Sequence, residues 1–166
     1  MMNFGIRRAR SEDWRAIHRI HERAVPYELH FLDEAARPRM ESLERVFRGD
    51  LWVAEAASEI LGFAACVGTE ISWLYVDPSH FRRGIGRALL RHAVEHCGEA
   101  AHATVLANNV ASLALMASEG FETAARETVS IVGYGVARVH KVRRVRRQCD
   151  MRPIAVREAR MADAVT

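Results

Sequence analysis

The chain has 166 residues, of which 49% are hydrophobic and 27% are charged, and this size and composition suit one globular domain with its own core. Its formal net charge of +3 is too small to require a nucleic-acid partner. The opening residues MMNFGIRRAR lack the apolar stretch of a signal peptide. The longest apolar run, ILGFAACVG, is far too short to span a bilayer, so we expect neither secretion nor a membrane partner.

The three cysteines, Cys66, Cys97 and Cys149, are odd in number and are not clustered. Two of them fall in segments predicted to be buried. This pattern suits a reducing cytoplasm better than a disulfide framework. We therefore expect a cytoplasmic protein in which Cys66 and Cys97 are core thiols.

The first part of the chain predicts a strand followed by two helical segments. The strand covers Phe4–Ala9. Ser11 is a good N-cap for the first helix, and Asp13 lies in its first turn. A second helical region runs from about Asp33 to Phe47 and is interrupted near Pro38. One apolar face of the first helix consists of Trp14, Ile17, Ile20 and Ala24.

Three strands and a helix follow. Two strands, LWVAEA and EILGFAACVG, form a hairpin around Ala57–Glu59. The third, EISWLYV, covers Glu70–Val76 and ends at Asp77, because Pro78 offers no amide to a sheet ladder. The next helix has a regular apolar stripe, formed by Leu89, Leu90, Ala93, Val94 and Cys97.

The last part predicts a strand, a short helix and two more strands. The strand covers His102–Ala107, and Asn108-Asn109 cap a helix that ends at Gly120. The final strands are FETAARETVSIV and GVARVHKVRRV. The order β-α-α-β-β-β-α-β-α-β-β is that of a mixed α/β sheet. The apolar side of the short helix includes Val110, Leu113 and Ala117.

Two glycines, Gly84 and Gly86, stand at the start of the helix that follows EISWLYV. A helix start carries unpaired N–H groups and the positive end of the dipole, and glycines let another group approach that backbone closely. Arg82, Arg83 and Arg87 add positive charge, so the sequence predicts an anion site, most plausibly for phosphate. The alternative is that the glycines only shape a turn. Neither a P-loop nor a complete dinucleotide fingerprint is present.

Three segments in this order resemble the GNAT superfamily of acyl-CoA-dependent N-acetyltransferases. GDLWVAEAASEILGFAACV resembles its central hairpin, ISWLYVDPSHFRRGIGRALL its cofactor motif, and VLANNVASLALMASEGFE its Asn–helix–Gly-Phe segment. The resemblance implies one GNAT-type α/β domain over residues 1–148. Its sheet would be mixed, mostly antiparallel and splayed between the central strands, with about four flanking helices. Residues 149–166 would form a tail.

The resemblance also implies acetyl-CoA as cosubstrate and no metal. The amides from Arg82 to Arg87 would hold the pyrophosphate, and the end of the preceding strand would pair with the pantetheine arm. Asn109 and Ser112 would flank that arm. The implied cofactor-binding residues are Leu74, Tyr75, Val76, Arg82, Arg83, Gly84, Ile85, Gly86, Arg87, Asn109 and Ser112.

The implied reaction is direct transfer of an acetyl group to an amine on a small molecule or peptide of unknown identity. Two catalytic candidates follow, Glu70 and Tyr75. Glu70 would take the amine's proton through water, or it is an exposed charge at a hairpin end. The Tyr75 hydroxyl would point toward the acceptor, or the ring only packs. Backbone N–H groups at a strand bulge would stabilise the oxyanion.

The sequence departs from the family pattern at two positions. Phe81 stands where the cofactor motif prefers Gln or Arg, so some cost in affinity is expected. Met116 stands where many members have a Tyr that protonates the leaving thiolate, and a thioether cannot donate a proton. Met116 motivates an alternative function, an acyl-CoA-binding module with little catalysis.

Other patterns carry weaker hypotheses. The pairs His18/His21 and His92/His96 lack further ligands at metal spacing. The basic run Arg138–Arg147 motivates a second alternative, a nucleic-acid-binding protein, although its alternating valines favour the solvated face of a strand. Acidic residues before the hairpin, Glu28, Asp33 and Glu34, could attract a cation.

The C-terminal segment IAVREARMAD, Ile154–Asp163, repeats the pattern of FGIRRARSED, Phe4–Asp13. The match is short, and two readings stay open: chance, or the opening strand of a second, truncated copy of the domain. We expect the tail either to be disordered or to add a strand to a neighbouring chain, which would make a homodimer.

Overall fold

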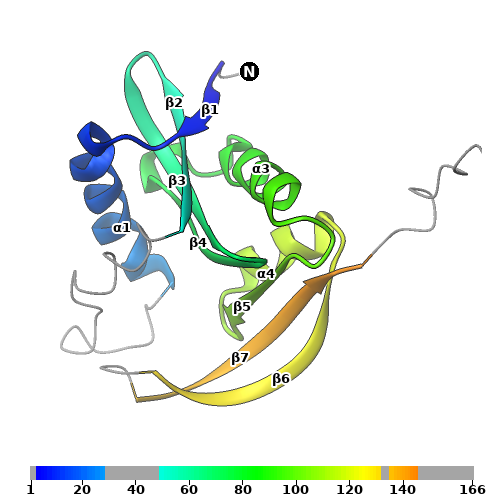
Figure 1. Cartoon of the computed structure of the whole chain (residues 1–166). Helices are drawn as coiled ribbons and strands as arrows, with labels where there is room; N and C mark the ends of the chain where they lie inside the picture. Colours follow the sequence, from blue (N-terminus) through cyan, green and yellow to red (C-terminus); the bar gives the residue numbers. More distant parts are fainter. Residues whose placement is uncertain (1–2, 29–48, 132–134, 146–166) are drawn as a thin grey trace, which may run out of the picture.

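The computed structural model describes residues 3–28, 49–131 and 135–145. Within these ranges seven strands form one sheet in the order β1-β2-β3-β4-β5-β7-β6 (Figure 1). Every neighbouring pair is antiparallel except β4 and β5, which are parallel. The sheet is therefore mixed and mostly antiparallel, as predicted. The strands are β1 (Gly5–Arg8), β2 (Asp50–Ala56), β3 (Glu59–Val67), β4 (Glu70–Val76), β5 (His102–Leu106), β6 (Phe121–Ile131) and β7 (Gly135–Arg144).

Three α-helices lie in the described part of the chain, and α1 and α3 cover opposite faces of strands β2 to β4 (Figure 1). The sequence predicted about four helices. The predicted helical region Asp33–Phe47 and the predicted tail 149–166 both lie outside the described residues. The helices are α1 (Trp14–Glu28), α3 (Ile85–Cys97) and α4 (Val110–Ser118), with short 3-10 turns η1 (Ser11–Asp13) and η4 (Pro78–His80).

The alternation of side chains along the central strands gives each face of the sheet its own apolar core. On β2, Trp52 packs in the cluster on the α3 side, whereas Val53 packs in the cluster on the α1 side. Ile17 and Ile20 on α1 are fully buried, as the sequence predicted. The predicted stripe of α3 is also buried: Leu89, Leu90, Ala93, Val94 and Cys97.

The hairpin between β2 and β3 is confirmed and is tight. Ala56 pairs with Glu59, so the loop has only Ala57 and Ser58. Both loop residues have positive φ, 47° and 65°. Positive φ at both central positions is the requirement of a type I′ turn, whose twist matches that of the flanking strands.

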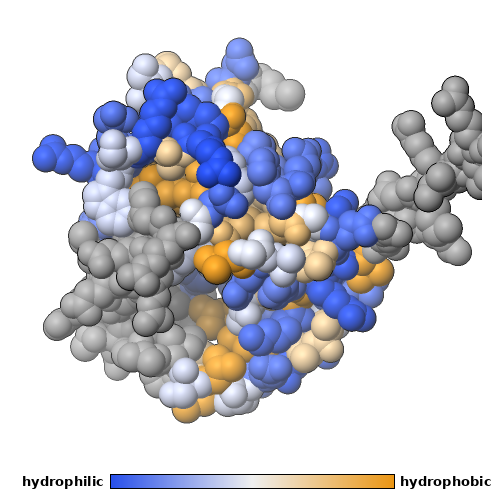
Figure 2. All heavy atoms as spheres, in the orientation of Figure 1, coloured by the Kyte–Doolittle hydropathy of each residue, from blue (hydrophilic) through white to orange (hydrophobic). Residues whose placement is uncertain are grey.

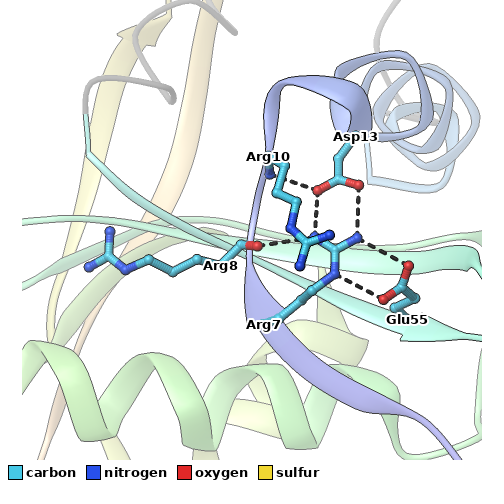
Figure 3. Close-up of polar contacts among 5 residues, drawn as sticks. All are labelled: Arg7, Arg8, Arg10, Asp13 and Glu55. Carbon is cyan, nitrogen blue, oxygen red and sulfur yellow. Dashed lines mark hydrogen bonds and ion pairs between the residues drawn. The ribbon is translucent and has the colours of Figure 1, made fainter.

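The start of the first helix differs from expectation. Ser11 was the predicted N-cap, but Arg10 holds that position. The Asp13 carboxylate accepts the Arg10 N–H at 2.7 Å and two N–H groups of Arg7 at 2.7 and 3.0 Å. Arg7 also pairs with Glu55 on β2 at 2.9 Å (Figure 3). One guanidinium therefore joins β1, η1 and β2, and it stabilises the helix start in place of a serine cap.

The strands β4 and β5 separate soon after they begin. Between them only Glu70 and His102 are paired, although β4 has 7 residues and β5 has 5. The whole of β5 pairs instead with β7, and the long curved pair β6–β7 continues on that side (Figure 1). The predicted splay is confirmed. It leaves one edge of β4 open beyond Glu70 among the described strands.

The predicted apolar side of α4 is wrong at two positions. Val110 is 71% exposed and Ala117 is also exposed, while Leu113 is partly buried. The residue that α4 buries is Met116. The helix has only nine residues and is apolar on almost every side, so the sequence period cannot identify its buried face.

The described part of the basic run on β7 alternates as expected for a solvated strand face. Val139 and Val142 are buried, whereas Arg138 and Arg143 are exposed. The arginines therefore point away from the core that the valines help to form.

Candidate active site

The loop between β4 and α3 contains two residues with left-handed backbone conformation, Arg82 with φ 64° and Gly84 with φ 82°. Such turns direct successive N–H groups toward one point and suit an anion. A Cβ built on Gly84 would meet no heavy atom within 4 Å. The space beside this backbone is therefore open.

The loop leads directly into the first turn of α3. The Ala88 N–H donates to the Gly84 carbonyl at 3.1 Å, and the amides before it have no partner within the helix, as at every helix start. Gly86 lies between Val76 and Leu115, and a Cβ on it would be 3.6 Å from a methyl group of each. The protein itself would tolerate that contact.

The three arginines predicted beside the anion are not equivalent. Arg82 and Arg83 are exposed. The Nε atom of Arg87 lies 3.0 Å from Oε1 of Glu119 at the end of α4, and the Nε atom of Arg91 lies 2.7 Å from Oε2 of the same carboxylate. Arg87 is thus already paired, and the sequence did not identify Glu119 as its partner.

The end of β4 presents different side chains to the two faces of the sheet. Leu74 and Val76 pack against the cluster on the α3 side. Tyr75 packs with the cluster on the α1 side. Because β5 has already diverged, the backbone of these three residues borders the gap between the two strands.

A bulge in β4 determines where Glu70 points. Cys66 pairs with Ile71, but Ala65 pairs with Trp73, so Ser72 is an extra residue in β4. Ile71 packs on the α3 side and Trp73 on the α1 side. Glu70, which precedes Ile71 in an alternating strand, is therefore placed on the α1 face with Trp73. Glu70 is partly buried and lies at the closed end of the splay.

A second carboxylate lies at the open end of the splay. The Tyr75 hydroxyl donates to Glu28 Oε2 at 2.5 Å, and the Asn109 side chain also hydrogen-bonds this carboxylate. Asn109 caps α4, because its Oδ1 accepts the Ser112 N–H at 3.1 Å. Glu28 at the end of α1 therefore links both walls of the gap.

The sequence signal for the contacts of Glu28 is its position on α1. Glu28 follows Ala24 by four residues and so continues the buried stripe of α1. Burial raises the pKa of Glu28, and its hydrogen bonds to Tyr75 and Asn109 oppose that rise. A carboxylate on an apolar stripe indicates a buried polar contact.

His21 lies one layer behind this contact. Its ring packs edge-on against Trp73 and Tyr75, with centroids 5.1 Å away in each case. Burial lowers the pKa of His21 to about 4, and its Nε2 has no hydrogen-bond partner among the described residues. His21 therefore supports the Tyr75 ring as a neutral group.

Neither histidine pair gathers further ligands in the described ranges, where no group of three or more His, Cys, Asp or Glu side chains could hold a metal ion. His18 Nδ1 lies 3.6 Å from Glu22 Oε2. His96 packs against Trp52 with centroids 4.5 Å apart. His96 is exposed and His18 and His92 are partly buried, whereas His21 is buried.

The two departures from the family pattern have clear positions. Phe81 packs edge-on against Tyr27, with ring centroids 5.3 Å apart. Met116 is buried in the core on the α3 side.

Cys66 and Cys97 are buried in the same core, with their sulfur atoms 2.6 Å apart. Burial raises the pKa of both thiols.

Among the described residues, no helix is both long enough and apolar enough to cross a bilayer. Hydrophilic and hydrophobic residues are interspersed over the face shown in Figure 2.

Comparison with known proteins places this geometry in context. Residues 48–123 match the family model described as "Acetyltransferase (GNAT) domain". The chain is 30% identical over 135 residues to the peptidyl-lysine N-acetyltransferase YjaB of Salmonella typhimurium, covering 80% of this chain and 92% of that protein. The solution structure of apo YjaB from Escherichia coli superposes with a TM-score of 0.67 at 26% identity, over 84% of this chain and 97% of that one.

A third comparison shows the fold alone. The structure of yncA from Salmonella typhimurium, described as a putative acetyltransferase with its cofactor acetyl-CoA, has a TM-score of 0.66 at 22% identity. The match covers 87% of this chain and 95% of that one.

Proposed function

Because the chain belongs to the GNAT acetyltransferases, we propose that it moves the acetyl group of acetyl-CoA to the amine of a lysine-like acceptor on a peptide or small molecule. The observation that carries this proposal is the opening between β4 and β5, which leads to a helix start with an open, left-handed loop. The lysine-like acceptor is supported by the name of the relatives, which are peptidyl-lysine N-acetyltransferases.

The residues present fit acetyl-CoA. The open space at Gly84 and the unpaired amides at the start of α3 suit its pyrophosphate. The exposed Arg82 and Arg83 add charge there. The free edge of β4 from Leu74 to Val76 suits the amide groups of the pantetheine arm. When bound, acetyl-CoA supplies an acetyl group activated as a thioester.

The chain's own groups would then handle the acceptor's proton. An alkyl ammonium is mostly protonated at neutral pH and must lose a proton before it attacks. Glu70 lies on the α1 face of β4 beside the bulge at Ser72, and we assign it the role of accepting that proton through water. The N–H groups around the bulge are donors for the acetyl oxygen.

The test is release of free thiol from acetyl-CoA with a panel of alkyl amines, polyamines, amino acids and lysine peptides, together with calorimetry of CoA binding. We expect turnover with at least one cationic amine. Tight CoA binding without turnover for any acceptor would instead favour an acyl-CoA-binding module, the alternative that Met116 motivates. Salt-sensitive DNA or RNA binding without affinity for CoA would contradict both.

A further inference from the structure

Glu28 has no role assigned above in holding the cofactor or in proton transfer, although its two partners, Tyr75 and Asn109, are residues expected beside the cofactor. We propose that the Glu28 carboxylate binds a second positive charge on the acceptor, distinct from the nitrogen that is acetylated. The proposal rests on the proposed function. It names the preferred substrate class: acceptors with two cationic groups, such as diamines or lysine peptides with a neighbouring basic residue.

The first step is the chemistry of the contact. A carboxylate offers about four acceptor sites, and Tyr75 and Asn109 are both neutral donors. No Arg or Lys in the described ranges forms an ion pair with Glu28. Among the described residues its partners are neutral, and a partly buried carboxylate with only neutral partners is costly. An ammonium or guanidinium group would supply the missing charge and use the remaining acceptor sites.

The second step is location. Glu28 is held by residues from both sides of the gap, because Tyr75 belongs to β4 and Asn109 caps α4. A group bound there lies at the open end of the splay. The site is therefore next to the predicted cofactor residues and is not a remote surface charge.

The third step separates the two carboxylates. Glu70 and Tyr75 lie five positions apart on β4, which corresponds to roughly 15 Å of strand. Glu70 is at the closed end, and Glu28 contacts Tyr75 at the open end. The two carboxylates are therefore assigned to opposite ends of the gap. If Glu70 serves the reacting amine, Glu28 serves another charge.

The test compares Glu28→Gln with wild type on n-butylamine, which has one charge, and on a series of α,ω-diamines of increasing length. The amide of glutamine keeps an acceptor for Tyr75 and removes the charge. In the wild type we expect kcat/KM to rise to an optimum along the series. Glu28→Gln should lose about ten- to a hundredfold on the best diamine, the range for hydrogen bonds to a charged group, and should lose much less on n-butylamine.

Binding gives a readout that does not require turnover. Mono-acetylated diaminoalkane keeps only the second ammonium, so it probes Glu28 alone. Added to the protein without acetyl-CoA, it should shift the side-chain amide resonance of Asn109 in the wild type but not in Glu28→Gln. Glu22→Gln is the control, because Glu22 is an exposed glutamate on the same helix, with 65% of its side chain accessible.

The pH dependence of selectivity provides a third test of the proposal. Selectivity for diamines should fall as the pH drops through the raised pKa of Glu28, and this loss should be absent in Glu28→Gln. Within the described ranges, the other groups near Glu28 are Tyr75, the neutral Asn109, and His21 behind the Tyr75 ring. The pKa of His21 is about 4, so His21 stays neutral through the upper part of that window.

The outcomes separate the two proposals. Equal losses on n-butylamine and on diamines would make Glu28 a residue of the reacting amine and would overturn the inference. Unchanged selectivity, with only a lower melting temperature, would make it a structural contact and would also overturn it. Absence of turnover by the wild type with every amine would count against the proposed function itself, and the resonance shift would then still decide the role of Glu28.

Discussion

The two glycines of the loop predicted to hold the cofactor have different backbone environments, and alanine substitutions separate their expected effects. Gly86→Ala adds a methyl group at ordinary contact distance from Val76 and Leu115, and alanine is the better helix former by about 0.5–1 kcal/mol. We predict unchanged or slightly raised thermal stability, measured by calorimetry, with weaker CoA binding. Gly84→Ala places a side chain at φ 82° and should cost about 1 kcal/mol of stability.

The glutamate variants complete this prediction. Gly84→Glu or Gly86→Glu should abolish acetyl-CoA binding, because each places a negative side chain in the anion site. Normal binding by either variant in a titration calorimeter would show that the loop does not hold the phosphates.

Glu70 can be tested by its effect on the pH dependence of turnover. We predict that Glu70→Gln lowers kcat most at low pH, because the amide cannot accept the acceptor's proton, and that it leaves CoA affinity unchanged. Glu59→Gln, at the exposed start of β3, is the matched control. A pH–rate profile identical to that of the wild type would reduce Glu70 to a structural residue.

Met116 tests whether a proton donor is needed for the departing thiol. General acid catalysis typically contributes about 10²–10⁴-fold, so Met116→Tyr should raise turnover, or at least not lower it, if the local geometry follows the family. Met116 is only 4% exposed, and a buried phenol needs both space and a partner. We therefore expect a lower melting temperature for Met116→Tyr than for Met116→Leu. Equal turnover of the two variants would show that a donor here is irrelevant.

At the scale of elements, the Arg7–Asp13 contact makes the junction of β1, η1 and β2 sensitive to acid. Hydrogen bonds from Arg7, opposed by burial, hold the pKa of Asp13 below its usual range. The stabilisation is fully present above the pKa of the unfolded carboxyl. It is lost as the pH falls through the lower pKa of the folded one.

We predict that Asp13→Asn lowers the free energy of unfolding at pH 7 by about 1.5–3 kcal/mol, the range for hydrogen bonds to a charged group. The difference from the wild type should shrink as urea unfolding is repeated from pH 5 toward pH 2. A constant difference over that range would show that the charge of Asp13 does not stabilise the junction.

The bulge in β4 shows how one residue changes the chemistry of an element. If Ser72 were a regular strand residue and no bulge were present, strict alternation would place Glu70 and Trp73, three positions apart, on opposite faces. With it, Glu70 shares the α1 face with Trp73 and Tyr75. The Glu70 side chain and two aromatic rings are thereby brought to the same side of the sheet.

At the scale of the whole molecule, the sequence predicted the type and bounds of an element well where glycine or proline residues bound the segment. The bounds of β4 were predicted correctly because Gly68 and Pro78 flank a β-rich run. The sequence predicted the helix α4 but not its buried face, because the helix is apolar on almost every side. The partner of Arg87 and the contact of Glu28 with Tyr75 also escaped prediction, because they join segments far apart in the chain and depend on tertiary packing.

The buried thiols offer a measure of how α3 separates from the sheet during unfolding. Cys66 lies on β3 and Cys97 at the end of α3, and their exposed fractions are 2% and 7%. Because burial raises the pKa of both thiols, the reactive thiolate is scarce in the folded protein. Alkylation therefore requires an opening that separates α3 from the sheet.

We predict that iodoacetamide modifies neither Cys66 nor Cys97 in the native state, and that both react together at a rate that follows global unfolding as guanidinium is added. Peptide mass spectrometry after timed labelling measures each site separately. If α3 detached on its own, Cys97 and Cys66 would become reactive at denaturant concentrations below the midpoint of sheet unfolding. Because the helix start of α3 also forms one side of the predicted cofactor site, saturating CoA should then slow labelling of both thiols by stabilising the docked helix.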